Sequence, residues 1–268
     1  MKKISFFTPT YNRGYILKNL YNSLLRQTNK DFCWIIVDDG STDNTEELVR
    51  KWLFENNIEI IFRRQKNQGK MAAHNYGVKL SNTDLFVCID SDDFVVDNFV
   101  EIIISKQNYL SQNKIAGIIA YRGKSKDEPI GTEFNLDLKT STLSCIYNQG
   151  FIGDTTLVFK TDVIKKYPFP IIEGEKFITE SFVYDQIDKD YRYVLLPKVL
   201  TICEYRNDGL TLNGMKLVFN NPAGWAARSI QQGNSESEII KRMKHYIWAN
   251  SYQFMSKWKK LPIIPEKN

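Results

Sequence analysis

The chain contains few of the residues that bind transition metals or form disulfides. It has only two histidines, His74 and His245, so a histidine-rich zinc site is not expected. Its four cysteines, Cys33, Cys88, Cys145 and Cys203, form no C-x-x-C pair, and the first two lie in apolar, strand-like runs. The cysteine pattern therefore predicts reduced core thiols in a cytoplasmic protein.

Long apolar runs are also missing. The first residues, MKKISFFTPTYN, include two lysines but no extended apolar stretch, so a secretory signal is not expected. No run approaches the roughly 18 apolar residues that a membrane-spanning helix needs. The sequence predicts a cytoplasmic protein that contacts a membrane, if it does so, only at the periphery.

Two common phosphate-binding motifs are absent. NQGKMAAHN contains Gly69 and Lys70, but Arg64 stands where a P-loop has its first glycine, and Met71 replaces Ser or Thr. There is no G-x-G-x-x-G, so dinucleotide redox chemistry has no support. Two roles stay open for Lys70: a solvated lysine at a helix start, or a positive charge near a diphosphate.

The charge is concentrated at one end of the chain. Hydrophobic residues make up 43% and charged residues 25% of the 268 residues, which is ordinary for a globular α/β protein of one large or two joined domains. Seven Lys or Arg and only two Glu lie between Glu238 and Asn268, so that segment carries the whole net charge of +5. This distribution favours a local anionic partner and argues against nucleic acid.

The first hundred residues alternate between strand and helix patterns. Apolar runs predict strands, helical spacing predicts helices between them, and short connections predict a mostly parallel α/β sheet with helices on both faces. His74 falls in a predicted helix, where a structural or solvated role is expected. The expected strands are 4–8, 32–39, 58–63 and 85–90, and the expected helices begin at 16, 43 and 71.

Polar residues collect at the ends of three of these strands, at 8–13, 38–41 and 90–93. In an open α/β sheet, ligands bind beyond the carboxyl ends of the strands. Three carboxylates within 90–93 repel one another, and a divalent cation would offset that repulsion. Mg²⁺ and Mn²⁺ are usually held by one or two carboxylates together with substrate phosphates. The pattern therefore predicts a metal and a phosphorylated substrate, whereas Asp43 and Asp97 are expected only to cap helices.

The segments TPTYNR, IIVDDGSTDNT, NQGKMAAHNYGV and CIDSDD occur in this order over residues 1 to about 100. Together they resemble the N-terminal half of family 2 glycosyltransferases. The resemblance implies a GT-A fold, in which a Rossmann-like nucleotide-binding half is fused to an acceptor-binding half. The second half, with EKFITESFVYDQI and EYRNDGLT, is similar to bacterial members that build surface polysaccharides.

The resemblance also implies roles for individual residues in a nucleotide-sugar site. Asp39 would accept a hydrogen bond from the base, which fits the imide N–H of uracil and so a UDP-linked donor. Asp90 would face the ribose, and Asp92 would hold Mn²⁺ or Mg²⁺ against the two phosphates. Asp93 is a further candidate member of this cluster, and its alternative role is to cap the following helix. The other expected donor contacts are Thr8, Pro9, Tyr11, Arg13, Asp38 as support for its loop, Lys70 and Ser91.

Glu180 is the expected general base of an inverting transfer to an acceptor hydroxyl. It stands in FITESFVYDQI, where similar enzymes carry an acidic residue, although Ser181 breaks the usual Glu-Asp pair. The alternative is a structural role, in which Glu180 is an acid in the first turn of a helix and complements the helix dipole. Asp185 and Asp154 are the rival bases, and Arg206, next to Tyr205, is a further candidate for the diphosphate.

We expect a nucleotide-sugar-binding half at 1–100, an acceptor-binding half at 101–234 and a basic, aromatic helical tail at 235–268. In the tail, apolar residues recur at helical spacing with basic residues between them: Ile240, Met243, Ile247, Phe254 and Trp258. Two interpretations stay open: one or two helices packing on the body, or a basic face that touches an anionic membrane near a lipid-linked glycan acceptor.

Two other functions compete with glycosyl transfer to a glycan or lipid-linked acceptor. A sugar-nucleotide nucleotidyltransferase also places metal-binding aspartates on an α/β sheet, but it should show a glycine-rich basic loop after the first strand, and TPTYNRGY is not one. A non-catalytic nucleotide- or carbohydrate-binding module would not need the carboxylate cluster or Glu180.

Overall fold

A computed structural model describes residues 2–135, 137–203 and 214–258. Tyr205 and Arg206 lie outside the described residues. The chain forms two compact units, of which the first comprises Met1–Asn67, Ala73–Pro168 and Tyr184–Glu204. The second comprises Gln68–Ala72, Phe169–Val183 and Tyr205–Asn268. The functional division at 100 and 234 stays a prediction.

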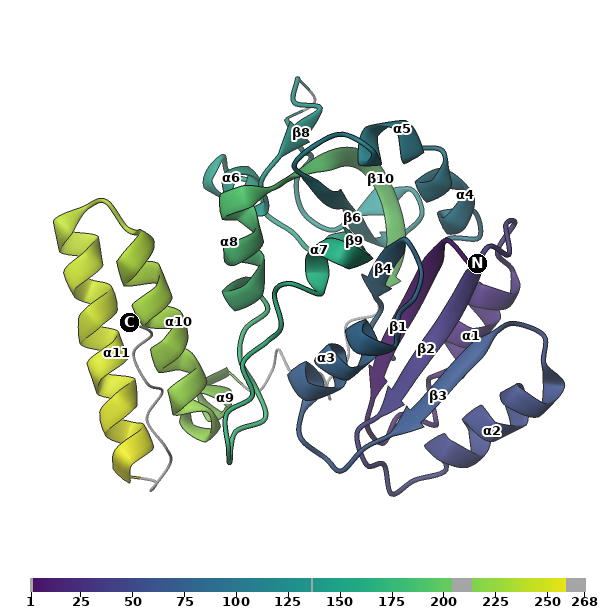
Figure 1. Cartoon of the computed structure of the whole chain (residues 1–268), viewed down its shortest axis with the longest axis horizontal. Coiled ribbons are helices and arrows are strands. Elements are labelled where there is room, and N and C mark those ends of the chain that lie inside the picture. Colours follow the sequence, from purple (N-terminus) through teal and green to yellow (C-terminus); the bar gives the residue numbers. More distant parts are fainter. Residues whose placement is uncertain (1, 136, 204–213, 259–268) are drawn as a thin grey trace. The chain divides into compact units, whose positions relative to one another are not determined.

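The first unit is built on a ten-stranded sheet in the order β3-β2-β1-β4-β9-β6-β10-β5, with β7 beside β6 and β8 beside β10 (Figure 1). The strands are β1 Ile4–Thr10, β2 Phe32–Asp38, β3 Ile60–Arg64, β4 Leu85–Cys88, β5 Asp93–Val95, β6 Ile115–Ser125, β7 Glu128–Pro129, β8 Thr140–Ser141, β9 Thr155–Lys160 and β10 Arg192–Cys203. The helices are α1 Lys18–Leu25, α2 Thr45–Glu55, α3 Lys70–Leu80, α4 Phe99–Ile104, α5 Gln107–Leu110, α6 Leu143–Asn148, α7 Thr161–Ile164, α8 Ser181–Asp190, α9 Gly214–Asn220, α10 Pro222–Ser235 and α11 Ile239–Trp258.

The strands β3, β2, β1 and β4 are parallel, as the alternation of strands and helices predicts. Beyond β4 the sheet becomes mixed, because β9 runs antiparallel to both β4 and β6, while β6 and β10 are parallel. The four predicted strands and three predicted helices of the first hundred residues are all present, with ends that move by only a few residues.

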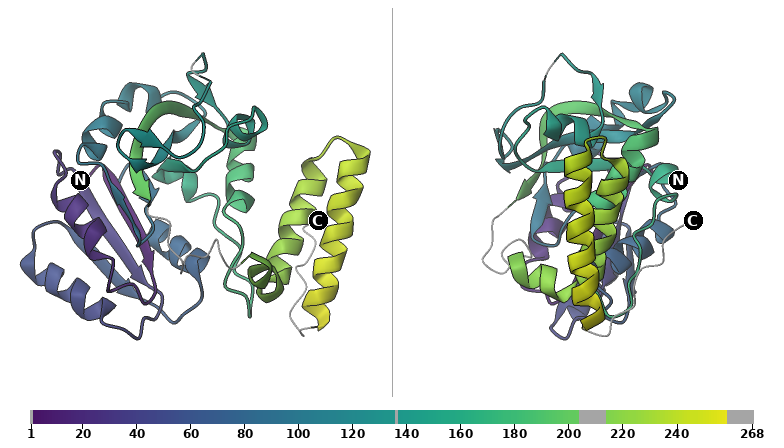
Figure 2. Two further views of the ribbon diagram at one scale, coloured as in Figure 1. Left: turned by 180° about the vertical axis from the view of Figure 1, so that it is seen from behind. Right: turned by 90° about the vertical axis from the view of Figure 1, so that its left-hand side faces the viewer.

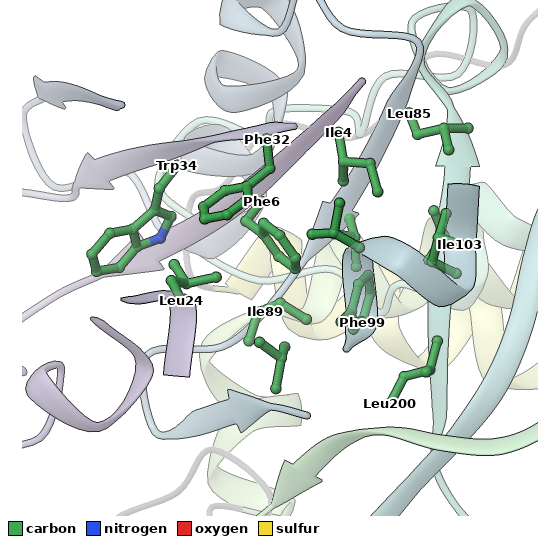
Figure 3. Packing of buried hydrophobic residues seen from close by; sticks show 14 of the residues in the cluster. Ile4, Phe6, Leu24, Phe32, Trp34, Leu85, Ile89, Phe99, Ile103 and Leu200 are labelled. Atoms are coloured by element: carbon green, nitrogen blue, oxygen red, sulfur yellow. The ribbon is translucent and has the colours of Figure 1, made fainter. Parts of the chain in front are cut away.

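Helices cover both faces of the sheet. Phe6 of β1 packs on one face with Phe32 and Phe99, in a core that also contains Leu24 of α1 (Figure 3). Phe7 points to the other face and packs there against His74 of α3. Each residue of β1 and β2 is buried, which explains why parallel strands appear as continuous apolar runs in the sequence.

The predicted cap at Asp43 is present in part, whereas the one at Asp97 is wrong. The N-cap residue of α2 is Asn44, but the carboxylate that bonds to the start of the helix belongs to Asp43, which accepts hydrogen bonds from the backbone N–H and hydroxyl of Thr45 and from the backbone N–H of Gly14. Glu46, in the first turn of α2, pairs with two arginines, Arg50 and Arg64. Asp97 makes an exposed ion pair with Arg26. Arg64 and Arg26 are distant along the chain from the carboxylates with which they pair, so no local sequence pattern identifies these partners.

The second unit ends in a hairpin of two long helices, α10 and α11, which lie side by side in all three views (Figures 1 and 2). Tyr246 of α11 contacts Gly233 of α10, and its hydroxyl donates a hydrogen bond to Asn234. Ala249 is buried on the same face. Within residues 2–135, 137–203 and 214–258, none of the helices combines the length and apolar character needed to span a bilayer.

Candidate active site

Three loops meet at one edge of the parallel strands. The last residue of β1, Thr10, is in register with Asp38 at the end of β2, and Asp38 is in register with Arg64 at the end of β3. Strand β4 runs parallel to β1 and ends at Cys88, two residues before Asp90. The polar groups predicted at strand ends therefore share the carboxyl edge, which is where ligands bind in open α/β sheets.

The loop after β1 contains both buried and exposed candidates. The side chain of Thr8 is fully buried, and its hydroxyl accepts a hydrogen bond of 2.9 Å from the indole N–H of Trp34. A donor contact by Thr8 would therefore come from its backbone, as would one by the buried Pro9. Tyr11 is 48% exposed, and the guanidinium of Arg13 donates to the hydroxyl of Tyr15. The exposed side chain of Tyr11 and the partly buried side chain of Arg13 are the ones that a ligand can reach.

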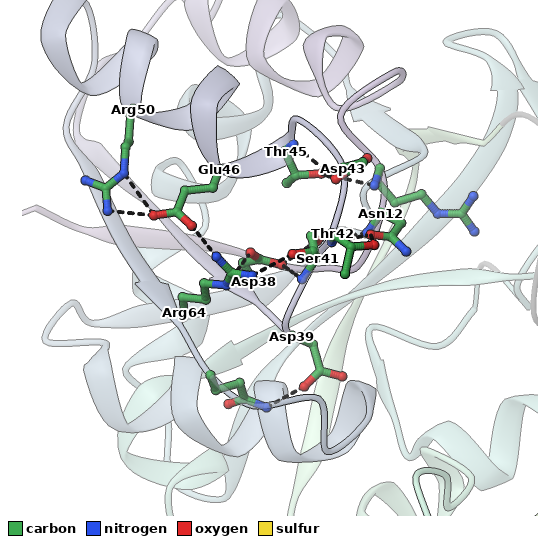
Figure 4. Close-up of polar contacts among 12 residues, drawn as sticks. Asn12, Asp38, Asp39, Ser41, Thr42, Asp43, Thr45, Glu46, Arg50 and Arg64 are labelled. Atoms are coloured by element: carbon green, nitrogen blue, oxygen red, sulfur yellow. Dashed lines mark hydrogen bonds and ion pairs between the residues drawn. The ribbon is translucent and has the colours of Figure 1, made fainter.

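Asp38 holds the loop after β2 in place (Figure 4). It is fully buried, and its Oδ1 accepts hydrogen bonds from the backbone N–H and hydroxyl of Ser41. Its Oδ2 lies 3.5 Å from Nε of Arg64, which also donates to the carbonyl of Ser41. The hydroxyl of Ser41 in turn accepts the backbone N–H of Asn12, so this loop is fastened to the loop after β1. These bonds agree with the supporting role predicted for Asp38.

Asp39 lies beside that loop with only 5% of its surface exposed. Gln65 donates a hydrogen bond of 2.8 Å to its Oδ1, and its backbone N–H donates to the carbonyl of Thr10 (Figure 4). Gly40 follows with a φ of +83°, and a Cβ there would lie 3.1 Å from the backbone nitrogen of Asn67. The glycine is needed for this backbone, which fixes the direction of the Asp39 carboxylate.

The carboxylates after β4 share one partly buried arginine. Arg122 of β6 lies 3.2 Å from Asp93 and 3.9 Å from Asp90, and it donates to the carbonyl of Thr155. Burial raises the pKa of Asp93 to about 7, with help from the charges of Asp90 and Asp92, although Arg122 lowers it. Burial lowers the pKa of Arg122, but the same carboxylates outweigh it and raise that pKa. The alternative role of Asp93 as a helix cap is wrong, because Asp93 begins β5 and pairs with Arg122.

Asp92 differs from its neighbours. Its side chain is partly exposed, and it makes no hydrogen bond or ion pair with any residue that the structure describes. Ser91 between the two candidates is buried. Residues 2–135, 137–203 and 214–258 contain no group of three metal-ligating side chains. Two carboxylates, from Asp90 and Asp92, are nevertheless a donor set that suits Mg²⁺ or Mn²⁺ when substrate phosphates complete the coordination.

Two further candidates come together in the second unit. The Nζ of Lys70, at the start of α3, lies 3.2 Å from Oε1 of Glu180, which directly precedes α8. Their side chains are 23% and 37% exposed, so both remain accessible. Lys70 is therefore an ion-pair partner of Glu180 and not a lone solvated lysine.

The segment that carries Glu180 is fastened to α10. The buried carboxylate of Glu175 accepts hydrogen bonds of 2.7 and 2.8 Å from the backbone N–H groups of Ala223 and Gly224, in the first turn of α10. The side chain of Asn221 accepts two backbone N–H groups of the segment, and Gln231 donates to the carbonyl of Phe182. These contacts hold the segment on either side of Glu180.

Several contributors were missed by sequence reasoning. Arg122 and Glu175 had a weak signal, since each is a charge in or near an apolar run, but nothing in the sequence identified their partners. Of the rival bases, Asp154 accepts the backbone N–H of Arg122 through its carbonyl, and Asp185 lies within α8. His74 is buried against two phenylalanines, which supports its structural role.

Comparison with solved structures identifies the fold. Staphylococcus aureus TarS 1–349 in complex with UDP-GlcNAc superposes with a TM-score of 0.65 at 19% identity, over 94% of this chain and 72% of that chain. A mannosyltransferase of Pyrobaculum calidifontis, in complex with GDP-Man and Mn²⁺, gives 0.61 at 14% identity, over 96% and 75%. The chain thus has the predicted GT-A glycosyltransferase fold.

Comparison of sequences identifies the family. Residues 5–167 match glycosyl transferase family 2, and the chain belongs to this family. The Streptococcus pneumoniae glycosyltransferase GlyG is 30% identical over 128 residues, which are 48% of this chain and 41% of GlyG. The chain therefore matches less than half the length of that relative.

Proposed function

We propose that this protein is a metal-dependent, inverting glycosyltransferase that moves a sugar from a UDP-linked donor to a hydroxyl of a bacterial glycan or lipid-linked acceptor. One observation carries the proposal: Asp92 has no partner among the described residues, whereas the adjacent Asp93 forms an ion pair with Arg122. A carboxylate without a partner beside Asp90, at the carboxyl edge of a parallel sheet, favours a cation and a phosphorylated ligand.

The donor is proposed to bind along the ends of β1, β2 and β4. Asp39 would accept the imide N–H of uracil, in the orientation that Gln65 and Gly40 give it. Asp90 would accept a ribose hydroxyl. The exposed side chain of Tyr11 and the partly buried side chain of Arg13 would contact the nucleotide. The UDP- and GDP-sugar complexes of the two structural neighbours support a nucleotide-sugar ligand of this class.

Asp92, with Asp90 nearby, would hold Mn²⁺ or Mg²⁺. When bound, such a cation supplies positive charge that stabilises the departing diphosphate. Support comes from the two-carboxylate donor set and from the Mn²⁺ in the mannosyltransferase complex. Arg122 assists by placing a positive charge 3.2 Å from Asp93 and 3.9 Å from Asp90, which offsets the repulsion among the three carboxylates.

Glu180 is proposed as the general base. It would take the proton of the acceptor hydroxyl while the acceptor oxygen forms a bond to the anomeric carbon and the bond from that carbon to the diphosphate breaks. Such a base contributes roughly 10²- to 10⁴-fold to the rate. A single displacement of this kind inverts the anomeric configuration. Lys70 orients the carboxylate through its 3.2 Å ion pair.

The test is a product assay with UDP-GlcNAc and Mn²⁺ in the presence of a mixture of bacterial glycans. The proposal expects release of UDP, strong loss of that release in Glu180→Gln, and unchanged UDP affinity in that variant. Glu173→Gln is the matched control, since Glu173 is an exposed acid of the same segment. Release of pyrophosphate from UTP and a sugar phosphate would instead show nucleotidyl transfer, and nucleotide binding with no turnover would show a binding module.

A further inference from the structure

Helix α11 carries an apolar stripe that no described residue covers. Ile240 is 82% exposed, Met243 59%, Ile247 60% and Phe254 71%. At 3.6 residues per turn these four side chains fall within an arc of about 60°. Large apolar side chains scattered singly on a surface are ordinary, whereas a stripe along one helix indicates an interaction site.

The stripe lies opposite the face that packs on α10. Ala249 and Ser256 are buried on the packed face, where Tyr246 bonds to Asn234 and Tyr252 lies near Trp225. One interpretation of the sequence pattern has one or two tail helices packing on the body of the protein. Helix α11 packs on α10 through small and aromatic residues, and this packing leaves the stripe exposed.

The charges within α11 have one sign, although Lys241 forms an exposed ion pair of 2.7 Å with Glu238, which lies just before the helix. From Ile239 to Trp258 the helix contains four cations and no acidic residue: the cations are Lys241, Arg242, Lys244 and Lys257. Lys244 lies over the ring of Trp248, with Nζ 4.8 Å from the ring centre, and that ring is 44% exposed. On the helix circumference, Lys241 and Lys244 flank one side of the stripe and Lys257 flanks the other.

We infer that α11 is a docking surface for an anionic lipid bilayer, with the stripe in the interface and the lysines at the level of the headgroups. Amphipathic helices with basic flanks and an aromatic residue bind such surfaces in this way. Charge complementarity favours an anionic bilayer over a second copy of this chain as the partner of the stripe. In a symmetric pairing of two copies through the stripe, the same lysines would approach one another without an acidic partner from α11. The inference does not depend on the proposed reaction.

The experiment measures partition of the full chain onto vesicles. Vesicles of phosphatidylcholine mixed with phosphatidylglycerol should bind the protein, and vesicles of phosphatidylcholine alone should bind it far less. Replacing Lys241, Lys244 and Lys257 together by Gln should weaken binding about 100-fold, because each lysine near an anionic surface contributes roughly fivefold. The double change Ile247→Ser with Phe254→Ser should weaken it at least tenfold, by an order-of-magnitude estimate from the apolar area lost.

The matched control variants remove the same kinds of side chain, an exposed apolar residue and three lysines, from positions outside α11. Phe54 of α2 is 92% exposed, so Phe54→Ser removes an exposed aromatic side chain outside α11. The triple change of Lys18, Lys51 and Lys189 to Gln removes three exposed charges outside the tail. Both controls should bind vesicles as the wild type does. Circular dichroism of each variant checks that the helices are intact.

Three outcomes would overturn the inference. The first is no binding to the anionic vesicles, or equal binding to vesicles of phosphatidylcholine alone. The second is equal loss in the control variants, which would show a diffuse charge effect. The third concerns a second copy: if sedimentation equilibrium gives a dimer that Ile247→Ser with Phe254→Ser converts to monomers, another copy of this chain occupies the stripe.

Discussion

Replacing Arg122 by Met should destabilise the first unit by an amount that depends on pH. Met replaces much of the apolar part of the Arg122 side chain. It leaves the buried Asp93 without the guanidinium cation, and the carbonyl of Thr155 without the hydrogen bond that Arg122 donates. A carbonyl left unpaired in the interior costs about 1–3 kcal/mol. That part of the loss does not change with pH.

The pH-dependent part comes from Asp93. Its folded pKa of about 7 lies above the ordinary 3.8, so the neutral carboxyl stabilises the fold fully at low pH, and this contribution is lost as pH rises towards 7. In the wild type, the decrease in stability caused by Asp93 ends near its folded pKa, at about pH 7. Without Arg122 the folded pKa moves higher, and stability continues to fall by about 1.4 kcal/mol per pH unit. From about pH 7 to about pH 8.5 the variant should therefore lose roughly 2 kcal/mol more than the wild type.

Urea unfolding followed by circular dichroism, with EDTA present, measures this difference at about pH 6 and about pH 8.5. The double variant Arg122→Met with Asp93→Asn should lose the extra pH dependence. Lys124→Met is the control, because its ion pair with Glu128 is exposed and should be worth less than about 1 kcal/mol at either pH. Equal destabilisation of Arg122→Met at both pH values would refute the assignment of Asp93 as its charge partner.

Three further changes test other parts of the structure by urea unfolding. Gly69→Ala should cost at least about 2 kcal/mol, because φ is +93° and the new Cβ would lie 2.0 Å from the carbonyl oxygen of Lys176; equal stability would contradict that close approach. Trp34→Phe should cost about 1–3 kcal/mol by leaving the buried Thr8 hydroxyl unpaired, and part of this should return when Thr8→Val is added. Glu175→Ala should cost about 3 kcal/mol or more through two lost charge-assisted hydrogen bonds, and a smaller loss than in Trp34→Phe would contradict this account of α10.

The sequence is most informative where one physical pattern dominates. The apolar run of Phe32–Asp38 is buried on both faces, and the spacing of Leu17, Leu20 and Leu24 places all three in the core. The strand-end carboxylates are also visible in the sequence, because a polar run directly after a buried strand is typical of the ligand-binding edge of a parallel sheet. These signals are local, so a single sequence contains them.

Partners distant along the chain could not be predicted. Asp93 and Glu46 carry the local pattern of helix caps, but arginines at positions 122 and 64 pair with them instead. The sequence points to Lys70 and Glu180 for separate reasons, and only the fold shows that they form an ion pair. In α11 the helical spacing is visible in the sequence, but the direction of the apolar stripe depends on α10, which packs against the opposite face.

The central claim is that Asp92 holds a divalent cation for a nucleotide diphosphate, and calorimetric titration of UDP with and without Mn²⁺ tests it most directly. Asp97→Asn is the control, since Asp97 is an exposed aspartate that pairs with Arg26 on the surface. The account predicts UDP binding that requires Mn²⁺ in the wild type and in Asp97→Asn, and that is lost in Asp92→Asn. Binding of UDP to Asp92→Asn with unchanged Mn²⁺ dependence would contradict it.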